Sequence, residues 1–143
     1  MSTFDLMVRL LLAAGLGAAI GLEREFRRKP AGLRTNILIA VGAALFTMVS
    51  IALAHDGGTS DRVAAQIVTG IGFLGAGAIM RSGRNIHGMT TAATIWVNAA
   101  VGMAVGAGLY TMAIVATAVT LVVLGVLPPF EAYFDRRTGG PTS

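Results

Sequence analysis

The stretch that decides the fold of this chain runs from Met89 to Leu127 and reads MTTAATIWVNAAVGMAVGAGLYTMAIVATAVTLVVLGVL. It belongs to a longer segment, residues 85–129, that contains no Asp, Glu, Lys or Arg. The whole chain of 143 residues is 55% hydrophobic and 13% charged, whereas soluble domains carry roughly 25% charged residues. A soluble protein of this size needs a polar surface and has nowhere to bury so long an uncharged stretch. The composition therefore predicts an integral membrane protein.

A membrane-spanning helix needs about 20 predominantly apolar residues. The quoted stretch is too long for one span and long enough for two, with a tight turn near Gly106-Ala-Gly108. Three more apolar segments precede it, namely Phe4–Leu22, Thr35–Ala54 and Val63–Met80. Backbone groups in lipid must bond within their own segment, and these runs lack the alternation of β-barrel strands. We therefore predict an all-α integral membrane protein, a bundle of five transmembrane helices over residues 1–128, followed by a short polar cytoplasmic tail over residues 129–143.

Lys and Arg residues gather in loops that such a bundle places on one side of the membrane. Nine of the eleven lie there: Arg24, Arg27, Arg28, Lys29, Arg34, Arg81, Arg84, Arg136 and Arg137. Because basic loops stay in the cytoplasm, we expect the N-terminus outside and the C-terminus inside. Basic residues directly after the first apolar segment also disfavour a cleaved signal peptide, since they hinder translocation. The net charge of +4 indicates anionic lipid headgroups as partners, with no nucleic acid.

Residues 69–80, TGIGFLGAGAIM, contain the spacing Gly70-x-Gly72-x-x-Gly75, which is typical of dinucleotide-binding loops. Here the glycines lie inside an apolar span and no acidic residue follows until Glu131, so we reject nucleotide binding. In lipid, small residues instead let helix backbones approach closely. We expect the third span to lie centrally, with neighbours pressed close on two sides. The glycines predicted to mediate helix packing are Gly15, Gly70, Gly72, Gly75, Gly77 and Gly102, with Gly17, Gly21 and Gly106 as further small-residue positions.

Polar residues inside apolar spans are costly and normally face protein or a water-filled cavity. Three spans carry a narrow polar, small face: the second with Asn36, Thr47 and Ser50, the third with Gln66 and Thr69 near its outer end, and the fourth with Thr91, Thr94 and Asn98. Together these faces would line a cleft from the cytoplasmic side toward mid-membrane. In the alternative interpretation, each threonine bonds the carbonyl four residues earlier and Asn98 joins two helices. Asn98 lies near the centre of its span, where an unpaired amide is costly.

The strongest polar cluster reads GLEREFRRKPAGLRTN, residues 21–36. Glu23 at the inner end of the first span and Arg34 at the start of the second can form a charge-assisted, bidentate pair. Either this is a surface ion pair that pins the hairpin, worth at most about 1 kcal/mol, or it forms the mouth of the cleft. The candidate functional polar cluster is Glu23, Arg34, Asn36, Thr91, Thr94 and Asn98.

The remaining residues form no catalytic pattern. There is no nucleophile–base pair, and the chain has no cysteine. His55 and His87 fall in loops on opposite sides of the membrane. His55 with Asp56 and Asp61 could bind a cation loosely, although a hydrated loop is the favoured interpretation. We therefore expect no enzyme activity, no cofactor and no metal site, and with no carboxylate at mid-membrane there is little support for magnesium transport.

Three stretches carry a resemblance to a known family: GLEREFRRKPAGLRTNILIAVGAALF, RVAAQIVTGIGFLGAGAIM and GMTTAATIWVNAAVGMAVGAG. They are similar, in this order and over nearly the whole chain, to the transmembrane domain of the MgtC/SapB family. The resemblance implies five spans in a bacterial cytoplasmic (inner) membrane, with the N-terminus outside. It also implies a link to magnesium homeostasis, to virulence, and to the membrane sector of the F-type ATP synthase as a partner. Longer members carry a soluble C-terminal domain, which we expect this chain to lack.

Two functional hypotheses follow from these observations. The first is a non-enzymatic regulatory membrane protein that packs small-residue faces against itself or a partner's helices, linked to magnesium and energy homeostasis. The second is a small channel or carrier for an ion or small polar solute, with the polar faces as its path and Glu23 and Arg34 at its mouth. Because five spans form a thin wall around a pore, we expect a homodimer in either case.

Overall fold

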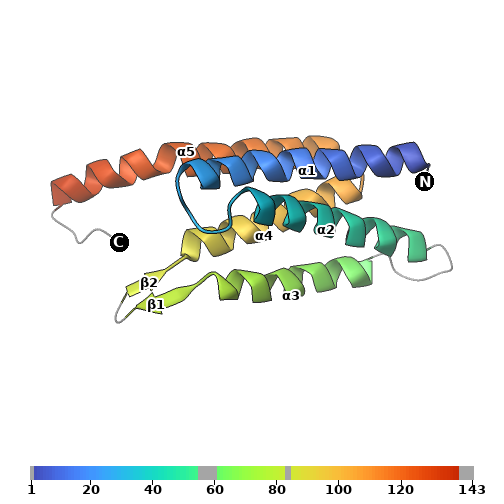
Figure 1. Ribbon diagram of the computed structural model, residues 1–143, viewed down its shortest axis with the longest axis horizontal. Helices are drawn as coiled ribbons and strands as arrows, with labels where there is room; N and C mark the ends of the chain where they lie inside the picture. Colours follow the sequence, from blue (N-terminus) through green and yellow to red (C-terminus); the bar gives the residue numbers. More distant parts are fainter. Residues whose placement is uncertain (1, 55–60, 83–84, 139–143) are drawn as a thin grey trace.

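The computed structural model of this chain describes residues 2–54, 61–82 and 85–138, and over these it is almost entirely helical (Figure 1). The five helices are α1 (Thr3–Phe26), α2 (Leu33–Leu53), α3 (Asp61–Gly77), α4 (Met89–Gly106) and α5 (Tyr110–Thr138). A short antiparallel hairpin, β1 (Met80–Ser82) with β2 (Asn85–His87), joins α3 to α4. The prediction of five helices is confirmed, whereas the hairpin is an element that the sequence did not lead us to expect.

The uncharged stretch divides at its glycines, as predicted. α4 ends in a Schellman motif, in which the N–H of Gly108 donates to the Val105 carbonyl at 3.0 Å and that of Leu109 to the Ala104 carbonyl at 2.8 Å. Gly108 has a φ of 82°, a left-handed conformation that glycine adopts without steric cost. The chain can therefore reverse between α4 and α5 within three residues, 107–109.

Four helical segments are long and apolar enough to cross a membrane: Thr3–Phe26, Leu33–Leu53, Met89–Gly106 and Tyr110–Pro128. The apolar part of α3, Val63–Gly77, is shorter. The chain is therefore a membrane protein, while a crossing by α3 and the orientation of the termini stay predictions. The α1–α2 connection, the hairpin and the last turns of α5 lie toward one end of the long axis, as the charge argument requires (Figure 1).

Helix α5 continues through Pro128 and Pro129 to Thr138. Its apolar part ends at Pro128, which is where the sequence placed the end of the fifth span. Residues 129–138 of the predicted polar tail are therefore helical. Their location in the cytoplasm stays a prediction.

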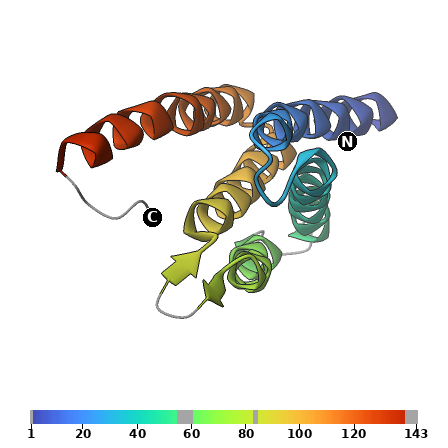
Figure 2. The same ribbon diagram turned by 60° about the vertical axis from the view of Figure 1, so that its left-hand side comes forward.

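Helix α4 lies at the centre of the bundle, where it contacts α1, α2, α3 and α5 (Figure 2). The expectation that the third span would be central is therefore wrong, because α3 packs beside α2 and α4 at the edge of the bundle. The glycines of α3 reflect this position, since a Cβ placed at Gly70, Gly72 or Gly77 would meet nothing within 4 Å. Gly15 on α1 is equally open, and a Cβ at Gly75 would make ordinary van der Waals contact with α4.

The close contacts lie instead between α1, α2 and α4, at Gly17, Gly21, Gly102 and Gly106. A Cβ at Gly17 would lie 2.7 Å from the Asn36 carbonyl oxygen. At Gly102 it would overlap the backbone of Ala40. Of the six glycines predicted to mediate packing, Gly102 makes such a contact, whereas the four open ones make none within the single chain. Small buried side chains fill the rest of this contact, namely Ala13, Ala40, Ala44, Val101 and Val105, and Ala113 of α5 packs against them.

This packing predicts opposite effects for two glycine-to-alanine changes. Gly102→Ala should destabilise the bundle by about 1–3 kcal/mol or more, because the added methyl group forces α4 away from α2. Gly72→Ala, in open space, should be neutral or should stabilise α3 by up to about 1 kcal/mol. Thermal unfolding of the purified protein in detergent, followed by circular dichroism, measures both. Equal effects of the two changes would contradict the assigned contacts.

Candidate functional site

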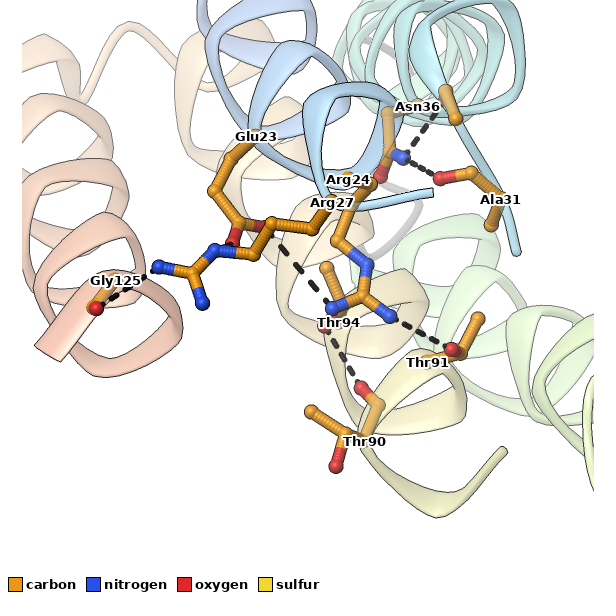
Figure 3. Close-up of polar contacts among 10 residues, drawn as sticks. Glu23, Arg24, Arg27, Ala31, Asn36, Thr90, Thr91, Thr94 and Gly125 are labelled. Carbon is orange, nitrogen blue, oxygen red and sulfur yellow. Dashed lines mark hydrogen bonds and ion pairs between the residues drawn. The ribbon is translucent and has the colours of Figure 1, made fainter. Parts of the chain in front are cut away.

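A buried arginine connects the end of α1 to the start of α4. Arg24 is only 4% exposed, and its Nη2 donates a hydrogen bond to Thr91 Oγ1 at 2.8 Å (Figure 3). Its Nη1 lies 4.0 Å from Glu23 Oε2, while its Nε has no hydrogen-bond partner among the described residues. A buried cation is costly unless it is paired, so these contacts hold α1 and α4 in one register.

Glu23 forms the second part of the site. Arg27 Nε lies 2.7 Å from Glu23 Oε1, and Arg27 Nη2 donates to the Gly125 carbonyl on α5 at 3.0 Å (Figure 3). Both carboxylate oxygens are buried, and within the described residues neither accepts a well-directed hydrogen bond, so the short contact with Arg27 acts as an ion pair. The carboxylate thus keeps hydrogen-bonding capacity that these residues do not use.

The predicted pairing of Glu23 with Arg34 is wrong. Glu23 pairs with Arg24 and Arg27, whereas Arg34 is exposed on the first turn of α2. The reason is helical spacing, because residues four apart on one helix are neighbours and Arg27 follows Glu23 at that interval. Arg34 belongs to a different helix and its side chain is turned outward.

Asn36 and Asn98 form the third part, and both are fully buried. Asn98 Nδ2 donates to the carbonyl oxygen of Asn36 at 2.7 Å and to its Oδ1 at 3.0 Å. Asn36 Nδ2 in turn donates to the carbonyls of Ala31 and Gly32, in the α1–α2 connection (Figure 3). The two amides therefore tie α4 to α2 and α2 to the preceding loop. Asn98 Oδ1 is left without a partner among the described residues.

The threonines divide into two kinds. Thr47 Oγ1 donates to the Ala43 carbonyl at 2.8 Å and Thr94 Oγ1 to the Thr90 carbonyl at 2.7 Å, so both bond within their own helix. This is the alternative that the sequence left open for threonines, and Asn98 joins two helices as that alternative also proposed. Thr91 is different, because its hydroxyl accepts the hydrogen bond of a buried arginine on another helix.

The structure therefore brings five of the six predicted cluster residues into the contact of α1, α2 and α4, and leaves Arg34 outside it. Arg24 is a residue of this site that the sequence does not single out, because it lies among the cations of the basic loop. A signal was available, because Arg24 follows Gly17 and Gly21 at intervals of seven and three residues. It therefore lies on the face along which α1 approaches α2.

Two apolar grooves open on the surface, away from these polar contacts. The larger, of about 630 Å³, lies between α2 and α3 and has Gly42 and Gly70 in its walls, with Thr35 and Gln66 as its polar residues. The second, of about 460 Å³, is bordered by α2, α3, α4 and the start of α5. Neither groove is lined by Glu23 or by the buried arginine and amides described above.

In the part of the chain that the structure describes, no group of three or more His, Cys, Asp or Glu side chains lies close enough together to hold a metal ion. His87 is exposed on β2. The loose cation site considered at Asp61 also needs His55 and Asp56, which lie outside the described residues.

Comparison with known proteins identifies the family. A model described as the MgtC family matches residues 10–133. The chain is 50% identical over 131 residues to "Putative magnesium transporter YhiD" of Escherichia coli K12, covering 87% of this chain and 61% of the relative. It is 50% identical over 121 residues to "Protein MgtC" of Salmonella typhimurium LT2, covering 85% and 52%. The chain thus spans little more than half the length of these curated relatives, and no solved structure matches it.

The site predicts unequal roles for two arginines of the same basic stretch. Arg24→Gln should lower the free energy of unfolding by about 2 kcal/mol, because it removes a charged hydrogen bond to Thr91 and an ionic neighbour of Glu23. Arg34→Gln, at an exposed position, should change stability little. Thermal melts of both variants in the same detergent measure the difference. If Arg34→Gln proved the more damaging change, the assignment of the buried cation would fail.

Proposed function

We propose, from the premise that this chain belongs to the MgtC family, that it is a non-enzymatic regulatory membrane protein. It would act by packing helix faces against a second copy of itself or against another membrane protein, in the adaptation of a bacterium to low magnesium and to changes in membrane energetics. From the family resemblance, we propose the membrane sector of the F-type ATP synthase as a protein partner. From the basic loops, we propose anionic lipid headgroups as a further partner. The bacterial inner membrane is the proposed location.

One observation carries this proposal. The residues that could have lined a path through the bundle face one another across α2 and α4, where the backbones touch. A Cβ at Gly106 would lie 2.5 Å from the Ala44 carbonyl oxygen, and one at Gly102 would overlap Ala40. Contact this close leaves no width for a hydrated ion between these helices, so the polar side chains support assembly of the bundle rather than conduction through it.

The surface available for regulation is the groove between α2 and α3, and we propose a second copy of the chain as its occupant. Gly42 and Gly70 lie in its walls with nothing within 4 Å of their Cβ positions. Phe73, 82% exposed, lies one turn from Gly70 on the same helix. A two-fold contact would therefore offer each copy both a groove and a large side chain to fill the partner's groove, as a self-complementary interface requires.

The second candidate, a carrier, is favoured by a different observation. The Glu23 carboxylate and Asn98 Oδ1 are buried oxygens whose hydrogen-bonding capacity is unused among the described residues. Such oxygens suit a cation or ordered water, and a relative carries the name of a magnesium transporter. Under this candidate the helices must separate to expose them.

Reconstitution separates the two candidates. Purified protein in liposomes with an internal magnesium-sensitive dye should give no flux above that of protein-free vesicles. A magnesium flux in the wild-type protein that is lost in the Asn98→Leu variant would support the carrier and would contradict the regulatory function. A growth assay of the source bacterium at low magnesium tests Glu23→Gln in parallel, which should impair growth while membrane insertion stays normal; normal growth would reduce Glu23 to a structural residue.

The proposal that a second copy of the chain occupies the groove is tested by measuring the oligomeric state of the protein. Gly70→Leu should fill the groove and shift the protein from dimer to monomer, and Phe73→Ala should weaken the dimer, because both remove the proposed complementarity. Phe4→Ala, a similarly exposed phenylalanine at the far end of α1, is the matched control. Native mass spectrometry in detergent measures the distribution. A wild-type monomer, or a dimer insensitive to both Gly70→Leu and Phe73→Ala, contradicts this use of the groove.

A further inference from the structure

Helix α5 contains two adjacent prolines and does not end at them, since it runs from Tyr110 to Thr138 through Pro128 and Pro129. Proline has no backbone N–H, so each one leaves the carbonyl four residues earlier without its normal helical donor. The carbonyls concerned are those of Leu124 and Gly125. Within a membrane such freed groups persist where a neighbouring side chain supplies the missing hydrogen bond.

Arg27 supplies that bond to Gly125. Its Nη2 donates to the Gly125 carbonyl oxygen at 3.0 Å, the very carbonyl that Pro129 leaves free (Figure 3). The guanidinium is held on its other side by Glu23, whose Oε1 lies 2.7 Å from Arg27 Nε. Arg27 is itself fixed at the C-cap of α1, where its backbone N–H donates to the Glu23 carbonyl at 3.1 Å. A carboxylate on α1 is thus linked through one cation to a backbone carbonyl on α5.

The buried side chains described on α5 end at this level. Leu124 is the last buried residue that the structure describes on this helix, and Val126 and Leu127 are exposed. Beyond the prolines α5 extends past the end of α1 (Figure 1). The link from Arg27 to Gly125 therefore lies at the boundary between the part of α5 packed on the bundle and the part that continues beyond it.

We propose that Glu23, Arg27 and the Gly125 carbonyl form a latch that sets the direction of residues 130–138 relative to the bundle. When Arg27 leaves the carbonyl, the helix bends more freely at the two prolines, because that carbonyl has no helical donor to return to. Since Glu23 also neighbours the buried Arg24, a rearrangement of the polar contacts among α1, α2 and α4 is transmitted to the end of α5. This inference does not depend on the proposed regulatory function.

The experiment uses the absence of cysteine from the chain. Spin labels on Leu38→Cys, an exposed position on α2, and on Ala132→Cys, beyond the prolines, report the distance between α2 and the end of α5. Double electron–electron resonance in lipid nanodiscs gives the distribution of this distance. Arg27→Gln should raise the population of displaced orientations about two- to fivefold, the change expected from losing one solvent-exposed charged contact. Arg28→Gln, at the neighbouring exposed arginine, should leave the distribution unchanged.

A double-mutant cycle isolates the cause. Pro129→Ala restores a backbone N–H that can donate to the Gly125 carbonyl, so in that background Arg27→Gln should no longer broaden the distribution. Circular dichroism on every variant establishes that the bundle is folded. The latch is overturned if Arg27→Gln and Arg28→Gln behave alike, or if Arg27→Gln broadens the distribution as much in the Pro129→Ala background as in the wild-type chain.

Discussion

Direct backbone contact among α1, α2 and α4 is the constraint on which this structure depends. Lipid solvates apolar side chains as well as another helix does, so helices associate only where they fit closely enough to gain van der Waals contact and hydrogen bonds. Gly17 and Gly21 bring α1 onto the first turns of α2, and Gly102 and Gly106 bring α4 onto its middle. The positions of the other helices follow, because α3 and α5 pack on the outside of these three.

The same close approach makes the polar interior possible. Asn98 reaches both the backbone and the side chain of Asn36 because no side chain separates α4 from α2 at the neighbouring Gly102. Arg24 on α1 then reaches Thr91 on α4. In a low-dielectric interior such bonds are strong and an unmade one is costly, so they fix the register that the small residues permit. The unused oxygens of Glu23 and Asn98 are the places where this network is incomplete among the described residues.

This arrangement separates a rigid part from parts free to make other contacts. The three-helix contact is dense and its polar groups are mostly paired, which suits a scaffold. The open glycines of α3 and the apolar groove beside it lie outside that contact. The proposed binding at the groove therefore need not disrupt the helices that hold the chain together.

The sequence by itself determined that this chain is a helical membrane protein of the MgtC family, where its five helices lie, and which faces of α2 and α4 are buried. These follow from local rules: the length of apolar runs, the position of turn glycines, and the spacing of Asn36, Thr91, Thr94 and Asn98 on helical faces. Only the tertiary structure decided which glycines make contact, that α4 rather than α3 is central, and that Glu23 pairs with Arg24 and Arg27 instead of Arg34. Helical periodicity shows which residues share a face but not which neighbour that face meets. Choosing among several small-residue faces and several nearby arginines depends on how all five helices fit together in space.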